Sequence, residues 1–105
     1  MGKNSQKEKE DRERKEREEK EKIALLRSSG LFDEEWYVAT NKDVAEHGFD
    51  PVEHYLRYGA AEGRDPSPTF STRRYLEIHP DVAEAGLNPL VHYVKYGMVE
   101  QRPVV

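Results

Sequence analysis

An internal repeat constrains the fold of this chain more than any other feature. Residues 32–66 align without a gap on residues 70–104 at an offset of 38 residues, and 14 aligned positions carry the same residue. A period of this length is typical of a small supersecondary unit that cannot bury its apolar face alone and packs against a neighbour to do so. We therefore expect two repeat units, at residues 23–68 and 69–105, behind a charged segment at residues 1–22.

Start and stop signals inside each unit predict short helices. Asp, Asn and Ser are suitable N-caps, proline is tolerated in the first turn of a helix, and glycine commonly ends a helix in the left-handed conformation. In chain order these signals are Asp33, Gly48, Asp50-Pro51 and Gly59 in the first unit, and Ser71, Pro80, Gly86, Asn88-Pro89 and Gly97 in the second. No segment alternates apolar and polar residues over the length of a strand. We expect an all-α fold: a long charged N-terminal helix followed by two stacked units of about three short helices each.

The charged segment has the pattern of a solvated helix. Residues 3–22 carry nine basic and eight acidic side chains, and acid-to-base pairs four residues apart stabilise a helix by about 0.2–0.5 kcal/mol each. Six such pairs are present: Glu8/Arg12, Glu10/Arg14, Asp11/Lys15, Glu13/Arg17, Glu16/Lys20 and Glu18/Lys22. No apolar residue lies between Met1 and Ile23, which favours a frayed, solvated extension of the first packed helix over a rigid spacer or a coiled-coil stem. Ile23, Ala24, Leu25 and Leu26 are expected to tie this helix to the units.

Composition excludes several classes of function. The chain has no cysteine, so it can form neither a disulfide framework nor a thiolate metal site. It has no apolar run long enough to span a bilayer and no secretory signal, so we expect an unexported, soluble protein of the cytoplasm, with the periphery of the cell envelope as the alternative location. The chain beyond residue 22 carries eight basic and thirteen acidic side chains, and a net acidic body disfavours nucleic acid as a partner.

His54 and His92 occupy the same position in the two units. A zinc site needs three or four ligands, whereas each unit offers one such histidine with no second ligand one helical turn away. We therefore expect no metal and no cofactor. The preferred interpretation is a histidine packed at a helix interface, with an imidazole nitrogen bonded to the backbone, to Asp43 in the first unit or to Asp81 in the second.

Glu62 and Arg64 recur as Glu100 and Arg102. A carboxylate beside a guanidinium could serve acid–base chemistry, but such catalysis also needs a pocket and a second group of shifted pKa, and the sequence indicates neither. We expect structural pairs in which the arginine binds helix-terminal carbonyls or the aspartate of the D-V-A turn. The sequence also has no nucleophile arrangement and no phosphate-binding glycine loop, so we expect no enzyme.

Trp36 is the only tryptophan, and its counterpart in the second unit is Arg74. A position that accepts both side chains is not fully buried in both units, so we expect Trp36 to be partly exposed. It could join tyrosines such as Tyr37 in a platform for a sugar ring or for an apolar side chain of a partner. The alternative is that Trp36 covers the junction with the charged helix.

The units resemble a bacterial repeat with the pattern F-D-x-x-x-Y-L-x-x-N-P-D-V-A, then G-x-x-P-x-x-H-Y-x-x-x-G-x-x-E-G-R-x-P. Such repeats occur beside glycosyltransferase domains of envelope-polysaccharide assembly and in some large secreted repeat proteins. The resemblance spans residues 23–105, although Lys42 and Gln101 depart from the pattern, and it implies a helical accessory module without catalytic residues. The matching signature residues are His54, Tyr55, Tyr58, Gly59, Glu62 and Arg64, and in the second unit His92, Tyr93, Tyr96, Gly97, Glu100 and Arg102.

Together these observations predict a non-catalytic interaction module. We expect it to dock a partner protein or another domain of a longer parent chain, with the charged helix as spacer. The alternative function is a carbohydrate-binding module that holds a polysaccharide on exposed aromatic rings. The candidate interaction residues are Trp36, Tyr37 and Arg74. No feature of the sequence indicates an oligomeric state.

Overall fold

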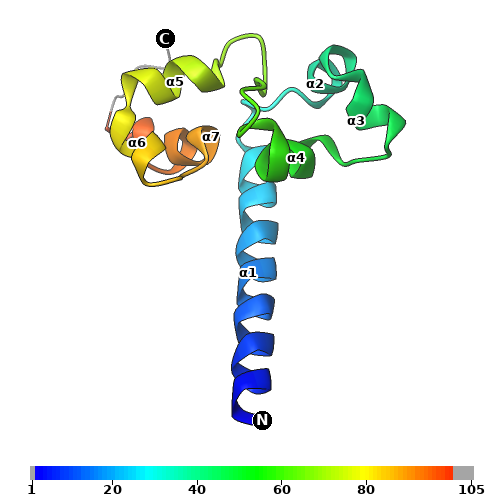
Figure 1. Cartoon of the computed structure of the whole chain (residues 1–105). Helices are drawn as coiled ribbons and strands as arrows, with labels where there is room; N and C mark the ends of the chain where they lie inside the picture. Colours follow the sequence, from blue (N-terminus) through cyan, green and yellow to red (C-terminus); the bar gives the residue numbers. More distant parts are fainter. Residues whose placement is uncertain (1, 101–105) are drawn as a thin grey trace.

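The computed structural model describes the backbone of residues 2–100 and the side chains of residues 5–100, which form the expected all-α fold (Figure 1). A long helix, α1 (Gly2–Ser28), which we call the stem, precedes two groups of short helices. Unit 1 contains α2 (Glu34–Thr40), α3 (Lys42–Glu46), α4 (Pro51–His54) and the π-helical turn η1 (Tyr55–Gly59). Unit 2 contains α5 (Thr72–Ile78), α6 (Pro80–Glu84), α7 (Pro89–His92) and the π-helical turn η2 (Tyr93–Gly97).

The stem ends between the two units, which lie on either side of its last turns (Figure 1). It contacts α4 of unit 1 and α7 of unit 2. Leu26 is fully buried at this junction, and Ile23 and Leu25 pack against the same core, whereas Ala24 is exposed. The predicted attachment of the charged helix through its last apolar turn is therefore confirmed, apart from Ala24.

The predicted local signals set most helix boundaries. Gly48 and Gly86 end α3 and α6 with φ angles of 69° and 68°, the left-handed conformation expected of a glycine after a helix. The predicted N-caps accept hydrogen bonds from backbone N–H groups of the following turn: Asp33, Asp50, Ser71 and Asn88. Short-range sequence chemistry therefore accounts for where these helices start and where the second helix of each unit stops.

The third helix of each unit differs from the prediction. α4 and α7 run directly into η1 and η2, and the backbone stays right-handed beyond the glycine that was expected to end the helix. Gly59 and Gly97 have another role. A Cβ atom added at Gly59 would overlap the hydroxyl of Tyr37, and one at Gly97 would lie 2.7 Å from the hydroxyl of Tyr75. Glycine is needed at both positions because a tyrosine side chain from the first helix of the unit lies directly against the backbone there.

Aromatic rings form the centre of each unit. Three rings meet with centroid separations of 5.2–6.0 Å: Phe32, Tyr37 and Tyr55 in unit 1, and Phe70, Tyr75 and Tyr93 in unit 2. Aliphatic side chains that are at least 99% buried complete these centres: Val44 and Val52 in unit 1, and Val82 and Leu90 in unit 2. Most of the recurring apolar positions therefore serve packing.

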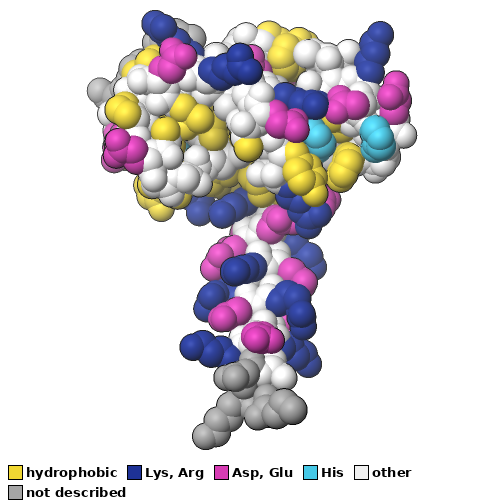
Figure 2. All heavy atoms as spheres, in the orientation of Figure 1, with side chains coloured by type: hydrophobic (Ala, Val, Ile, Leu, Met, Phe, Trp, Pro, Cys, Tyr) yellow, Lys and Arg dark blue, Asp and Glu magenta, His cyan; other side chains and the backbone are white. Residues whose placement is uncertain are grey.

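The stem beyond the units is exposed and carries charges of both signs along the face seen in Figure 2. Its ion pairs differ from those predicted. Arg14 lies 3.3 Å from Asp11 and 3.9 Å from Glu18, while none of the six predicted pairs closes in this described part of the stem. Ion pairs between long exposed side chains contribute little free energy, so several alternative pairings along the stem are close in stability. No helix among the described residues is long and apolar enough to cross a membrane.

Candidate functional site

The two recurring histidines are bonded to tyrosines inside the units. Nδ1 of His54 lies 2.8 Å from the Tyr37 hydroxyl, and Nδ1 of His92 lies 2.8 Å from the Tyr75 hydroxyl. All four side chains are buried. The prediction named the backbone or an aspartate as partner, and at Nδ1 it was wrong, because the first helix of each unit lays its tyrosine across the third helix. The equal spacing of 17 residues within both Tyr–His pairs follows from the ungapped repeat, as it does for every pair of recurring residues, so the sequence held no signal that identified this contact.

Burial keeps the pair in unit 1 neutral. It raises the pKa of Tyr37 to about 12, and burial together with the positive charge of Arg64 lowers the pKa of His54. When both groups are neutral, one of them can donate a hydrogen bond and the other can accept it; which one donates depends on the tautomer of the imidazole. The contribution of neutral His54 to the stability of the folded chain is present at pH values above the pKa of histidine in the unfolded chain. It is lost as the pH falls through the lower pKa that His54 has in the folded chain. No group of three or more His, Asp or Glu residues is placed to hold a metal ion within the part of the chain that the structure describes.

Arg64 joins the end of unit 1 to α3. Its two terminal nitrogens each lie 2.9 Å from a carboxylate oxygen of Asp43, and its Nε lies 2.9 Å from the carboxylate of Glu62. Of the two predicted roles for this arginine, the contact with the aspartate of the D-V-A turn is the one formed. The hydrogen bonds from Arg64 lower the pKa of Asp43. In unit 2, Glu100 is the last described residue and Arg102 lies outside the described residues.

The predicted platform of Trp36 and Tyr37 does not form. Tyr37 is fully buried, so its predicted exposure is wrong. Neighbouring residues on a helix point about 100° apart, so α2 can turn only one of the two rings fully into the core. Trp36 is partly exposed and Arg74 is exposed, as expected. The recurrence of Tyr37 as Tyr75, against the change from Trp36 to Arg74, distinguishes the core position from the surface position.

Exposed aromatic rings lie elsewhere in unit 1. Phe49 is 39% exposed and Tyr58 is 47% exposed, and their ring centroids are 5.8 Å apart. The equivalent side chains of unit 2, Leu87 and Tyr96, are 49% and 54% exposed. Sequence reasoning missed Tyr58 and Tyr96 because it treated recurring aromatic residues as core, and it did not consider Phe49, whose counterpart is Leu87.

The two units and the stem line a groove of about 390 Å³, which we call the inter-unit groove. Most of its lining is apolar, with one amide and one cation. The lining residues are Lys22 from the stem, Leu56, Ala60 and Ala61 from unit 1 and its following turn, and Leu76, Ala83, Gly86, Leu87, Asn88 and Pro89 from unit 2. The sequence could not indicate this groove, because its walls belong to segments whose relative placement is tertiary.

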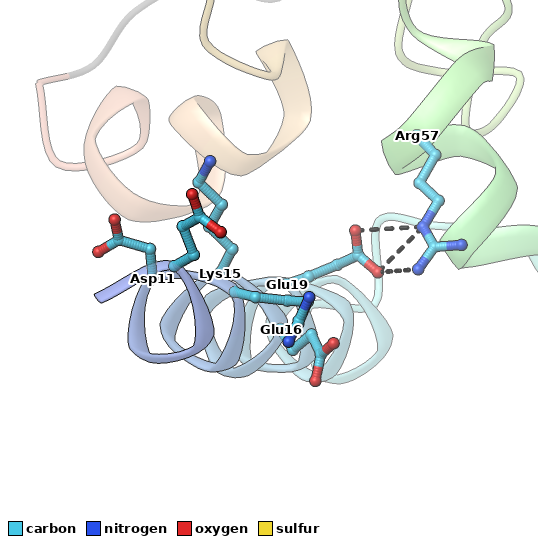
Figure 3. A pocket seen from close by; sticks show the side chains of 7 residues that line it. Asp11, Lys15, Glu16, Glu19 and Arg57 are labelled. Carbon is cyan, nitrogen blue, oxygen red and sulfur yellow. Dashed lines mark hydrogen bonds and ion pairs between the residues drawn. The ribbon is translucent and has the colours of Figure 1, made fainter. Parts of the chain in front are cut away.

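A second hollow lies between the stem and unit 1 and is charged (Figure 3). Arg57 reaches from η1 to the stem, where its Nε and Nη2 atoms lie 3.0 and 2.6 Å from Oε1 of Glu19. Its Nη1 atom lies 2.9 Å from the carboxylate of Glu53. Charged side chains of the stem, including Lys15, line the rest of the hollow. This arrangement is an ion-paired joint between the stem and unit 1.

No protein-family model, curated protein or solved structure matches the chain. Function is therefore inferred from the residues themselves. The histidines and the arginine that could serve chemistry are engaged in internal contacts, while the inter-unit groove and the apolar side chains beside it remain open.

Proposed function

We propose that the chain is a non-catalytic protein-docking module that presents two helical units at the end of a charged stem. The observation that carries this proposal is the inter-unit groove, to which both units and the stem contribute. Leu87 is half exposed at this groove, and apolar surface left open beside polar residues is typical of protein–protein contacts. The engagement of His54 and His92 with tyrosines supports a binding role over a catalytic one.

The partner is a separate protein or another domain of a longer parent chain. The resemblance to repeats beside envelope-polysaccharide glycosyltransferases supports a place next to such an enzyme, in the cytoplasm or at the periphery of the cell envelope. In that setting the stem acts as a spacer between the two units and the neighbouring enzyme. It does not pack against another helix, because its exposed charged surface offers no apolar seam.

The docking proposal is tested by affinity capture with two matched variants. Leu87→Asp places a charge at the inter-unit groove, and Val99→Asp makes the same chemical change at a side chain that is 84% exposed and does not line the groove. We expect proteins retained by the wild type to be retained by Val99→Asp and lost from Leu87→Asp, with both variants folded by circular dichroism. Retention of the same proteins by Leu87→Asp, or retention of none by the wild type, would contradict the proposal.

Carbohydrate binding is the second candidate, supported by the exposed ring pair of Phe49 and Tyr58. Aromatic faces stack on the apolar faces of sugar rings. Calorimetric titration with envelope-polysaccharide fragments should give heat with the wild type and none with a Phe49→Ala, Tyr58→Ala double variant. Absence of binding heat with the wild type at millimolar sugar would remove this candidate.

A further inference from the structure

The two units meet the stem through equivalent positions, but the stem neutralises the charges of unit 1 alone. In unit 1, Asp50 pairs with Arg27 and Arg57 pairs with Glu19. In unit 2 the position of Asp50 is taken by Asn88 and the position of Arg57 by Lys95. Lys95 forms no ion pair with any residue that the structure describes. At these two positions of unit 2, therefore, no described side chain of the stem forms the ion pair seen in unit 1.

Asn88 holds a buried donor without an acceptor. Its Oδ1 accepts hydrogen bonds at 3.0 Å from the backbone N–H groups of Leu90 and Val91. Its Nδ2 is buried and has no hydrogen-bond partner within the described part of the chain. Leaving a buried donor unpaired is unfavourable, so an oxygen atom would be stabilised there if a bound segment displaced the atoms that cover Nδ2. Asn88 lies in the lining of the inter-unit groove, where a bound segment can supply that oxygen.

Lys22 adds a positive charge to the same groove. It also lies with Lys95, Glu18 and Glu21 around the adjoining hollow between the stem and η2. Neither lysine is ion-paired to a described residue, and Glu18 contacts Arg14 at 3.9 Å. The groove therefore combines apolar walls with an unpaired amide donor and an unpaired ammonium group.

We infer that the inter-unit groove binds an acidic segment of a partner protein that also carries aliphatic side chains. The aliphatic side chains pack against Leu56, Leu76 and Leu87, and carboxylate or carbonyl oxygens bind Lys22 and Asn88. Apolar contact supplies most of the affinity, and the charge complementarity selects an acidic segment over a neutral or basic one. This inference rests on the proposed docking function and specifies the class of partner.

The test is fluorescence anisotropy on the full chain. The probe is a short fluorescein-labelled peptide that alternates glutamate and leucine, and its neutral control replaces glutamate with glutamine. Lys22→Glu reverses the charge at the groove. Lys20→Glu is the matched control, because residues two apart on a helix point about 200° apart and the net charge changes equally. Asn88→Asp removes the amide donor and introduces aspartate, the residue that unit 1 has at the equivalent position, Asp50. Aspartate is also a good N-cap.

We expect the glutamate–leucine peptide to bind the wild type and Lys20→Glu equally well. Lys22→Glu should weaken binding about fivefold or more, and Asn88→Asp about threefold. Circular dichroism shows whether each variant is folded. Equal weakening by the two lysine variants, equal binding of the two peptides, or no binding to folded wild type would overturn the inference. The docking function itself would survive any of these results if protein capture still depended on Leu87, and would fail if that dependence were also absent.

Discussion

Units 1 and 2 share one interior but differ in how they are joined to the rest of the molecule. In both, a tyrosine of the first helix lies against a glycine of the third helix and bonds a buried histidine at 2.8 Å. Two side chains of unit 1, Asp50 and Arg57, form ion pairs with the stem, whereas the corresponding residues of unit 2 are Asn88 and Lys95. The repeated residues therefore form the interior of a unit, and these two unrepeated positions distinguish how each unit is joined to the stem.

Tyr55 and Tyr93 are a repeated pair whose surroundings differ between the units. Tyr55 is fully buried, and its hydroxyl lies 2.8 Å from Oγ1 of Thr72, the first residue of α5. Tyr93 is the same residue at the same position of unit 2 but is partly exposed. The start of unit 2 therefore covers the tyrosine of unit 1, as expected for stacked repeats in which each unit covers its neighbour.

The largest expected effect comes from Gly59→Ala, which tests the shared interior. Alanine normally stabilises a helix relative to glycine by about 0.5–1 kcal/mol. Here the new methyl group would overlap the Tyr37 hydroxyl, so we expect a loss of about 1–3 kcal/mol in the free energy of unfolding, measured by urea denaturation. Gly97→Ala should cost less, because its new methyl group would lie 2.7 Å from the Tyr75 hydroxyl, whereas the one at Gly59 would overlap the Tyr37 hydroxyl more closely.

A double variant separates this overlap from a general effect on the helix. Tyr37→Phe removes the hydroxyl that the new methyl group meets, so Gly59→Ala should cost less in that background than in the wild type. The same loss in both backgrounds, or a stabilising effect of Gly59→Ala alone, would show that the close approach of Tyr37 does not determine the need for glycine.

These glycines mark the limit of what the sequence predicts. The helical class, the N-caps and the left-handed Gly48 and Gly86 follow from local backbone chemistry and are confirmed. Gly59 has the same local signature as Gly48, yet its role depends on a tyrosine 22 residues away in the chain. The Tyr–His hydrogen bonds and the inter-unit groove also depend on how separate helices meet, which no local pattern determines. The resemblance supplied the signature residues without indicating which of them would be exposed.

An intermediate effect on the free energy of unfolding is expected at Tyr55 and Tyr93. Tyr55→Phe removes a buried hydrogen bond between the units and should lower the free energy of unfolding by about 1 kcal/mol. Tyr93→Phe removes a hydroxyl from a partly exposed ring and should change it by less than about 0.5 kcal/mol. Urea denaturation of both variants gives the comparison. Equal losses would mean that the contact with Thr72 does not stabilise the junction of the units.

The smallest effect should come from the ion pairs that distinguish the attachments of the two units. Arg57→Ala removes the contacts with Glu19 and Glu53, so amide hydrogen exchange should become faster where the stem meets unit 1. Lys95→Ala removes the equivalent side chain of unit 2, which has no ion pair with the described residues, and should leave exchange unchanged. At about 1 M salt the screening length falls to about 3 Å, so the wild type and Arg57→Ala should become more alike. Equal acceleration by Lys95→Ala at low salt would mean that the stem is held by apolar contacts alone, and that the charge difference between the units does not determine how each is attached.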